Sequence, residues 1–342
     1  MMEPRPAPPL QDVDNQELKK LLSSLPKERG IISSDTYQYQ GFWYPPHALQ
    51  GIINCQEEFQ PRENDIFLVT PPKSGTTWLK AILYALVNRE AHPPQDPHHP
   101  LLSKTPHQLV PFLELLHPSE YVSVCNSSDS STRILATHVP LGTLPKAITG
   151  DSSSLNCKIV YLCRDTKDNF VSLFHFGNDR MKTSPISLED AFDLYCKGIS
   201  PGGPIWDQIL GYWKESQKNP HKVLFMRYEE MKDEPYLQLR RLANFLGIPF
   251  FPEEENSGLV DQIISICSFE SMTKVDVNKT GTFVDGSNNS SFFRKGVVGD
   301  WKNCLTADMA SRLDQITEEK FRGSGLSLSN ISSPCSPSPC KP

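Results

Sequence analysis

One short segment of the chain gathers the residue types that bind phosphate. It reads Pro72-Lys73-Ser74-Gly75-Thr76-Thr77-Trp78 and lies between an apolar run and a helical pattern. Gly75 permits a tight turn, and the amides after it are the unpaired donors of a helix N-terminus. The hydroxyls of Ser74, Thr76 and Thr77 add donors, and Lys73 adds a positive charge. The segment predicts an anion site, although an ordinary strand–turn–helix connection has the same pattern.

Three other apolar runs are also followed by residues that could act in catalysis or bind a ligand. His138 follows the second run, where a neutral imidazole could take a proton from a hydroxyl, or could be purely structural. Arg164 follows the third run and offers a planar fork for a phosphate, although a surface arginine at this place is equally ordinary. Tyr228 follows the fourth run and either stacks on a base or caps the core.

A basic stretch near the C-terminus adds two more cations. Arg294 and Lys295 stand next to Gly296, in a stretch with little helical or strand pattern. Such a stretch suggests a loop that closes on an anion, and a solvated basic loop is the alternative. If these cations gather with Lys73 and Arg164 at one edge, they focus a positive field on a small polyanion.

The elements that must position these residues are strands and helices in alternation. Apolar runs predict buried strands at Asp65–Thr70, Arg133–Thr137, Lys158–Cys163 and Lys222–Arg227. Periodic patterns predict helices at Thr76–Asn88, Lys167–Asp179 and Pro235–Leu246. The order predicts an α/β fold with a mainly parallel central sheet flanked by helices. In such sheets ligands bind beyond the carboxyl ends of the strands, where each of the four candidate segments begins.

Composition narrows the class of protein. The 342 residues include 34 Lys and Arg against 40 Asp and Glu, and the net charge of −6 argues against a nucleic-acid binder. No apolar run approaches the roughly 18 residues of a membrane span, and the polar start of the chain shows no secretory signal. Nine scattered cysteines without a CxxC pair favour a reducing compartment, so we expect a cytoplasmic protein. The His98–His99 pair could bind a metal, but a solvated loop fits better because no ligand partner stands at the right spacing.

Proline placement suggests where the folded part begins and ends. The chain holds 30 prolines, which cluster at both ends and in one internal loop. Between the ends no linker is visible, which favours one domain. We expect an N-terminal segment over residues 1–36 that is partly disordered, a single domain over residues 37–328, and a disordered Ser/Pro-rich tail over residues 329–342.

Taken together and in this order, the segments resemble the motifs of the cytosolic sulfotransferase family. The tracts at residues 39–44 and 111–114 resemble its plant branch in particular. The resemblance covers residues 37–328 and includes the Pro72–Trp78 loop, Thr137-His138, Arg164 with Ser172, Tyr228-Glu229-Glu230-Met231, and Arg294-Lys295-Gly296 with Gly299-Asp300-Trp301. It implies a domain that takes 3′-phosphoadenosine 5′-phosphosulfate and transfers its sulfuryl group to a hydroxyl of a small organic acceptor. Flavonoids, hydroxyjasmonates, phenolics and steroid-like alcohols are the acceptor classes.

The resemblance also implies a role for each matching residue. His138 would be the general base, and Lys73 would stabilise charge on the leaving phosphate. The 5′-phosphate would lie in the loop, the 3′-phosphate in a clamp, and the adenine against aromatic rings. The implied nucleotide contacts are the loop residues Lys73, Ser74, Gly75, Thr76 and Thr77, the clamp residues Arg164, Ser172, Arg294, Lys295 and Gly296, and the rings of Trp78 and Tyr228. No metal is implied, and neither nucleic acid nor membrane is an expected partner.

Two features depart from the family pattern. Ala136 stands where many members carry a lysine two residues before the histidine, so a second cation is missing or comes from elsewhere. This leaves open a nucleotide-binding homologue with impaired catalysis. The dimer motif of many animal members is also altered, with Ala307 and Ser311 after Lys302 and Thr306, which favours a monomer or a weak homodimer.

Two further questions stay open at the level of sequence. A kinase-like phosphotransferase on the same fold is the third hypothesis, and the absence of any Gly-Lys dipeptide argues against it. Four aromatic residues could line an acceptor pocket, although each taken singly fits a core residue better. They are Phe42, Trp43, Phe112 and Phe269.

Overall fold

The structure of the protein is a computed structural model. It describes residues 16–117, 119–120, 132–150, 155–284 and 286–328. The predicted disordered tail over residues 329–342 and the first fifteen residues of the predicted N-terminal segment lie outside the described residues.

A four-stranded parallel sheet forms the centre of the molecule. Its strands are β4 (Ile66–Val69), β5 (Ile134–Thr137), β6 (Lys158–Cys163) and β7 (Val223–Arg227), in the order β5-β4-β6-β7. All three pairs of neighbours are parallel, so the four carboxyl ends lie at one edge. Because every strand residue except Lys158 is buried, each strand reads as a continuous apolar run. The predicted α/β fold with a parallel sheet is confirmed.

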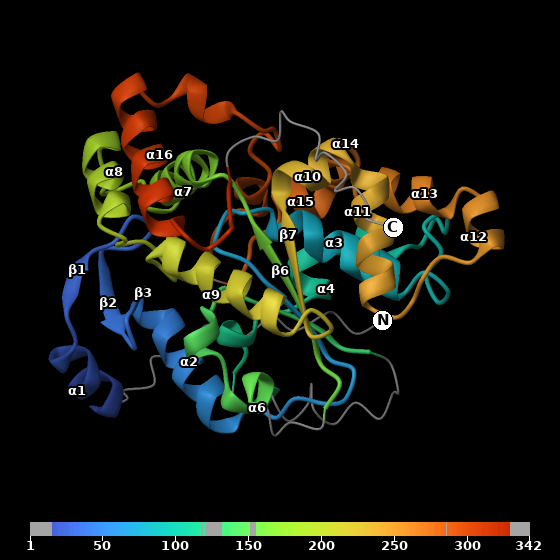
Figure 1. Cartoon of the computed structure of the whole chain (residues 1–342), viewed down its shortest axis with the longest axis horizontal. Coiled ribbons are helices and arrows are strands. Elements are labelled where there is room, and N and C mark those ends of the chain that lie inside the picture. The colour runs from blue at the N-terminus through green and yellow to red at the C-terminus, as the bar shows by residue number, and fades with distance from the viewer. Residues whose placement is uncertain (1–15, 118, 121–131, 151–154, 285, 329–342) are drawn as a thin grey trace, which may run out of the picture.

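Helices cover both faces of this sheet. Alternate strand residues point to opposite faces, so Phe67 and Val69 pack in one core and Ile66 and Leu68 in another. The first core is covered by α2 (Pro46–Glu58), α7 (Thr166–Arg180), α8 (Leu188–Cys196), α9 (Ile205–Lys218) and α16 (Ala307–Phe321). The second is covered by α3 (Thr76–Val87), α11 (Pro235–Phe245) and α13 (Leu259–Ile266). Figure 1 shows the two sets on the left and right of the labelled strands.

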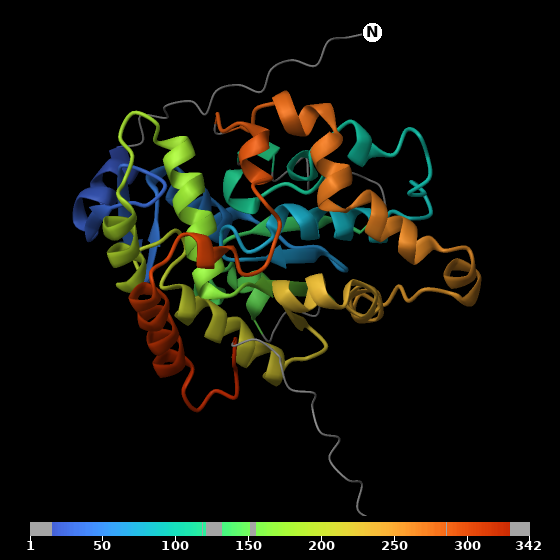
Figure 2. The ribbon, with the colours of Figure 1, turned by 90° about the horizontal axis from the view of Figure 1, so that it is seen from above.

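A small second sheet was not predicted from the sequence. It is antiparallel and consists of β1 (Lys27–Arg29), β2 (Asp35–Tyr39) and β3 (Phe42–Tyr44). A tight turn at Gln40 and Gly41, with φ of 50° and 87°, joins β2 to β3. All three strands are short, and β1 and β2 are largely polar, which hides the sheet from hydrophobic patterning. β2 spans the predicted domain boundary at residue 37, and the sheet lies at the opposite end of the molecule from α12 (Pro252–Asn256) (Figures 1 and 2).

Short elements complete the described chain. The remaining helices are α1 (Gln16–Ser24), α4 (Pro106–Leu109), α6 (Lys146–Thr149), α10 (Tyr228–Asp233), α14 (Phe269–Lys274) and α15 (Asp276–Thr280). The 3-10 turns are η1 (Pro100–Leu102), η2 (Leu113–Leu115), η3 (Leu141–Thr143), η4 (Asn289–Phe292) and η5 (Asp300–Asn303). Within the described part of the chain, no helix has the length and apolar character needed to cross a bilayer.

Candidate active site

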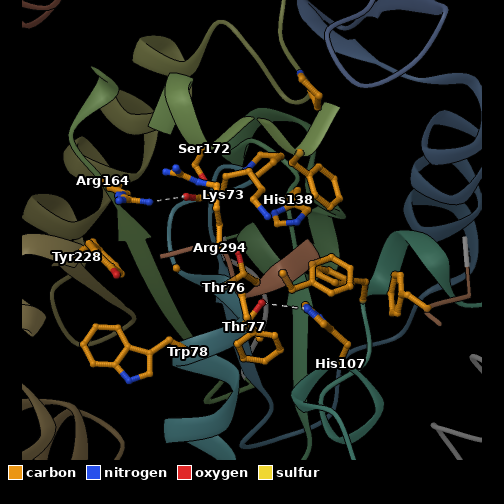
Figure 3. Close-up of a pocket in the computed structure, with 18 of the residues that line it drawn as sticks. Lys73, Thr76, Thr77, Trp78, His107, His138, Arg164, Ser172, Tyr228 and Arg294 are labelled. Carbon is orange, nitrogen blue, oxygen red and sulfur yellow. Dashed lines mark hydrogen bonds between the residues drawn. The ribbon is translucent and has the colours of Figure 1, made fainter. Parts of the chain in front are cut away.

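The carboxyl ends of the four strands open into a cavity of ≈ 370 Å³. Its wall includes eleven of the twelve residues predicted to contact the nucleotide, and His138. The twelfth, Ser74, is fully buried behind the loop, where its Oγ accepts a hydrogen bond from Asn169 Nδ2 at 3.0 Å. Figure 3 shows Arg164, Tyr228 and Trp78 on one side of the loop and His138 on the other.

The loop between β4 and α3 has the backbone of an anion site. Lys73 and Gly75 have left-handed backbone conformations, with φ of 67° and 104°. A Cβ at Gly75 would lie 2.7 Å from Tyr228 Cδ2, so both conformation and space require glycine there. Asn169 Nδ2 donates to the Pro72 carbonyl at 2.7 Å and fixes the start of the loop. Gly75, the N-cap residue of α3, makes no side-chain capping bond, so the first-turn amides are available to an anion.

Lys73 occupies a strongly positive and desolvated position. Its Nζ lies 4.1 Å from the centroid of the Phe176 ring and donates to the Ser291 carbonyl at 3.4 Å. Burial lowers its pKa to about 7, with further lowering by Arg294 and Arg164. A nearby anion would reverse this shift, so the free site favours a negatively charged ligand.

His138 is held in the orientation that a base requires. Its Nδ1 lies 2.8 Å from the Thr70 carbonyl oxygen, so Nδ1 carries the proton and Nε2 keeps a free lone pair. Glu114 Oε1 accepts from the His138 amide at 2.7 Å, and Gln208 donates to its carbonyl at 2.8 Å. Burial lowers the pKa of His138 to about 4, so the imidazole is neutral near pH 7.

Arg164 and the basic C-terminal stretch meet across the other side of the loop. Arg164 Nη2 donates to the Val297 carbonyl at 2.7 Å, and Nη1 to the Lys73 carbonyl at 3.5 Å. Arg294 and Lys295 both donate to the buried carboxylate of Asp300, at 2.6 and 2.7 Å. Burial alone would raise the pKa of Asp300, but the hydrogen bonds from Lys295, Asn303 and Arg294 lower it well below its usual range.

A buried carboxylate ties this basic stretch to the body of the protein. Asp168, in the first turn of α7, accepts from the Gly299 amide at 2.6 Å and from the Trp301 amide at 3.0 Å. The same carboxylate lies 3.7 Å from Arg164 Nη2. Asp168 therefore positions the Gly299–Trp301 turn and the Arg164 guanidinium together.

Aromatic rings and glycine complete the clamp side of the cavity. The rings of Trp78 and Tyr228 meet edge to face with centroids 5.6 Å apart, and the Arg164 guanidinium lies 4.6 Å from the Tyr228 centroid. Gly296 has φ of 66°, and a Cβ there would lie 2.6 Å from the Phe269 ring. Ser172 reaches the cavity from α7. These groups can enclose a planar base beside a phosphate.

The aromatic residues proposed for an acceptor pocket divide into two pairs. Phe112 and Phe269 line the cavity, whereas Phe42 and Trp43 lie outside its wall, in β3. The rings that accompany Phe112 come from Phe176, Phe283 and Phe292. The cavity is therefore apolar and aromatic next to the His138 imidazole, whose ring centroid lies 4.8 Å from that of Phe112.

Four polar residues of the site escaped the sequence analysis. Glu114 and Asp168 act on backbone amides, Asn169 holds the phosphate loop, and His107 contacts Thr77 through Nε2 at 3.1 Å. Nothing in their spacing separates them from surface or capping residues. Two of them carried a weaker signal: Glu114 ends a tract that resembles the plant members, and Asp168 stands in the first turn of the helix predicted from Lys167, four positions after Arg164.

A metal site is not formed by the residues that the structure describes, since no cluster of three or more His, Cys, Asp or Glu side chains gathers among them. His98 is exposed, whereas His99 is fully buried and accepts from the Leu101 amide through Nδ1 at 3.2 Å. The two imidazoles of this pair therefore occupy different environments.

Comparison with known proteins gives a consistent result. The family model for the sulfotransferase domain matches residues 63–325. Cytosolic sulfotransferase 6 of Arabidopsis thaliana is 46% identical over 321 residues, covering 91% of this chain and 95% of the relative. Cytosolic sulfotransferase 13 of the same plant is 44% identical over 311 residues, covering 90% of this chain and 93% of the relative.

Solved structures agree with these relatives. An Arabidopsis thaliana protein described as a candidate steroid sulphotransferase has a TM-score of 0.72 at 42% identity, covering 95% of this chain and 99% of that chain. A mouse sulfotransferase, SULT7A1, in complex with PAP has a TM-score of 0.65 at 26% identity, covering 85% of this chain and 96% of that chain.

Proposed function

The chain belongs to the sulfotransferase family, and on that basis we propose that it moves the sulfuryl group of 3′-phosphoadenosine 5′-phosphosulfate to a hydroxyl of a small organic acceptor, with His138 as the general base. Its dependence on this donor follows from the family, and its similarity to plant members confirms the branch predicted from the sequence. The names of the Arabidopsis relatives also agree with the predicted cytoplasmic location.

One observation carries the assignment of the nucleotide site. Among the residues that the structure describes, the buried Nε atoms of Arg164 and Arg294 have no hydrogen-bond partner, and both residues line the cavity. An unsatisfied buried guanidinium donor costs free energy of order 1–3 kcal/mol, which a bound anion removes. A nucleotide with two phosphate positions fits this donor set, because the loop offers amides and hydroxyls for one and the arginines face the other.

The residues of the chain then have distinct tasks. The free lone pair of His138 Nε2 accepts the proton of the acceptor hydroxyl, while the Thr70 carbonyl fixes the ring. Lys73 and the α3 amides stabilise negative charge at the 5′-phosphate. Arg164, Ser172, Arg294, Lys295 and the Gly296 amide bind the 3′-phosphate, and Trp78 and Tyr228 enclose the adenine.

The aromatic part of the cavity supports a phenolic or polycyclic alcohol as acceptor. Phe112, Phe176, Phe283 and Phe292 provide flat apolar walls, and Phe112 adjoins the proposed base. Flat hydroxylated rings fill such a space and present a hydroxyl to His138. Flavonols, hydroxyjasmonates, salicylate and hydroxysteroids form the test panel, and the Arabidopsis neighbour's description supports including steroids.

Incubation of the protein with donor labelled in the sulfuryl group and this panel tests the proposal. We expect a labelled sulfate ester with at least one acceptor. His138→Ala should lower kcat by about two orders of magnitude, the scale of general-base catalysis, and leave the affinity for adenosine 3′,5′-bisphosphate unchanged. If the affinity falls as well, His138 is structural.

The same assay separates active transfer from the impaired homologue considered for Ala136. Ala136 is fully buried in β5 and pairs with Phe112 through an isolated bridge, so position 136 contributes no cation to the cavity. Binding of the bisphosphate without labelled product from any acceptor would support the impaired homologue. Weaker bisphosphate binding by Arg164→Ala tests the clamp independently of turnover.

A further inference from the structure

A chain of three polar side chains runs from the interior of the protein to the phosphate loop. Lys80 lies on α3, one turn after Thr76, and is fully buried. Its Nζ lies 3.2 Å from His107 Nδ1, and His107 Nε2 lies 3.1 Å from Thr77 Oγ1. Thr77 and His107 line the cavity, and Figure 3 shows the contact between them as a dashed line. None of the proposed steps yet uses Lys80 or His107.

The surroundings of Lys80 fix the direction in which it donates. Its Nζ lies 3.2 Å from the centroid of the Phe112 ring, whose negative face attracts N–H groups. Lysine donates from its amino group in either protonation state, so a further N–H serves His107 Nδ1. Burying this amine without partners would be unfavourable, and the two contacts offset that cost.

The position of the proton on His107 follows from this contact. Burial lowers the pKa of His107 well below its usual range, and the charges of Lys80, His138 and Lys73 lower it further, so the ring is neutral and carries one N–H. With Lys80 as the donor to Nδ1, the proton lies on Nε2, which then donates to Thr77 Oγ1. The hydroxyl hydrogen of Thr77 is then free to point away from His107.

We propose that Lys80 and His107 are positioning residues that hold the Thr77 hydroxyl as a hydrogen-bond donor to the 5′-phosphate of the nucleotide. The inference rests on the proposed function and deepens it, because the 5′-phosphate is the group that leaves with the nucleotide. A hydroxyl fixed in advance as a donor loses no orientation when that charge develops.

The packing around His107 keeps this chain rigid. The His107 ring stacks on Phe112 at 5.4 Å between centroids and contacts Phe292 at 4.4 Å and Phe283 at 5.2 Å. α4, which carries His107, is closed by a capping box between Thr105 and Gln108. The imidazole is therefore held by rings on several sides and has little freedom to turn away from Thr77.

The chain of Lys80, His107 and Thr77, called the relay below, is tested by calorimetry. The two nucleotides are adenosine 3′,5′-bisphosphate and adenosine 3′-monophosphate. His107→Phe keeps an aromatic ring among the neighbouring rings and removes both hydrogen bonds. We expect it to weaken bisphosphate binding about tenfold, the scale of one hydrogen bond to a charged group, and to leave monophosphate binding unchanged. Lys80→Met, which keeps the length of the side chain, should act in the same direction with a smaller loss.

Two further tests distinguish a positioning role of His107 from a packing role. His107→Gln places an amide donor near the position of Nε2 and should recover most of the lost affinity. In the Thr77→Val background, His107→Phe should have no further effect on bisphosphate binding, because the hydroxyl it orients is gone. His98→Phe, on an exposed histidine outside the cavity wall, is the matched control and should leave both affinities unchanged.

Three results would overturn the inference. Equal weakening of the binding of both nucleotides by His107→Phe would show a packing role. An unchanged bisphosphate affinity would show that His107 has no role in binding. Additive effects of His107→Phe and Thr77→Val would show that His107 does not act through Thr77. If the unmodified protein binds neither nucleotide, the proposed function fails together with the relay, which distinguishes that outcome from failure of the relay alone.

Discussion

Asp168→Asn is the substitution whose effect the structure predicts most fully. The carboxylate accepts from the Gly299 and Trp301 amides at 2.6 and 3.0 Å and lies 3.7 Å from Arg164 Nη2. Asparagine has nearly the same shape, but it keeps one acceptor oxygen and turns an NH₂ group toward the second amide donor. The substitution therefore removes one hydrogen bond and the charge opposite Arg164 without opening a cavity.

The size of the effect follows from these contacts. A hydrogen bond to a charged group contributes about 1.5–3 kcal/mol, and the remaining amide would face another donor. We take about 2 kcal/mol for the whole change, which is roughly 30-fold in an equilibrium constant. This weakening falls on the segment that carries Arg294, Lys295 and Gly296, so binding of the 3′-phosphate should suffer most.

The assay compares adenosine 3′,5′-bisphosphate with adenosine 5′-monophosphate by calorimetry. In the unmodified protein the bisphosphate should bind more tightly, and Asp168→Asn should reduce that preference by about 30-fold. Asp190→Asn is the matched control, because Asp190 occupies the same third position of a helix, in α8, but is exposed. Its removal should change neither the preference nor the melting temperature by a measurable amount.

Two results would refute this reasoning. If Asp168→Asn behaves like Asp190→Asn, the carboxylate does not hold the Gly299–Trp301 turn. If both nucleotides weaken equally, Asp168 supports the fold in general and not the 3′-phosphate clamp.

Three more predictions concern the loop and the base. Because burial lowers the pKa of Lys73 to about 7, nucleotide binding at pH 8 should be accompanied by the uptake of close to one proton. Calorimetry in buffers of different ionisation heat measures this uptake, and an equal uptake by Lys73→Met would contradict the prediction. The folded pKa of His138, about 4, lies below its ordinary 6.5, so its contribution to stability is complete above pH 6.5 and is lost as the pH falls through 4. Lowering the pH from 7 to about 5 charges Lys73 and leaves His138 neutral, so kcat/KM should not fall over this range; a pH–rate profile that falls below pH 6.5 would exclude His138 as the base. Gly75→Ala should weaken bisphosphate binding at least about tenfold, because φ of 104° and a Cβ 2.7 Å from Tyr228 both strain the loop. Gly211→Ala is the control and should leave binding unchanged, because its Cβ would lie 3.7 Å from the nearest atom, Leu141 Cβ.

The central fold was predictable because each of its signals is local. Four apolar runs and the helices after them give the strands to within one residue and show which segments follow their carboxyl ends. The parallel arrangement follows from the length of the connections, since each contains a helix or a long crossover. The turn at the Pro72–Trp78 loop was predictable because Gly75 and its neighbours act through backbone that is continuous in sequence.

The residues that support the site were not predictable, because their partners are distant in sequence. Asp168 meets the Gly299 amide 131 positions away, and Asn169 meets the Pro72 carbonyl 97 positions away. His107 comes from a four-residue helix with no periodic signal. The aromatic wall was also not fully predictable. Phe42 and Trp43 share a strand with Tyr44, but of these three only Tyr44 lines the cavity.

Under the proposed function, the strand order lets one edge of the sheet accommodate both substrates. Along the chain the site residues appear as Lys73, His138, Arg164 and Tyr228, after β4, β5, β6 and β7. In the sheet the order is β5-β4-β6-β7. His138 therefore lies at one end of the edge, the Pro72–Trp78 loop lies next to it, and Arg164 and then Tyr228 follow toward the other end. Under the proposed assignment this is the order of acceptor hydroxyl, 5′-phosphate, 3′-phosphate and adenine. Acceptor and adenine thus lie at opposite ends of the edge, and the aromatic wall beside His138 can differ among relatives without disturbing the nucleotide clamp.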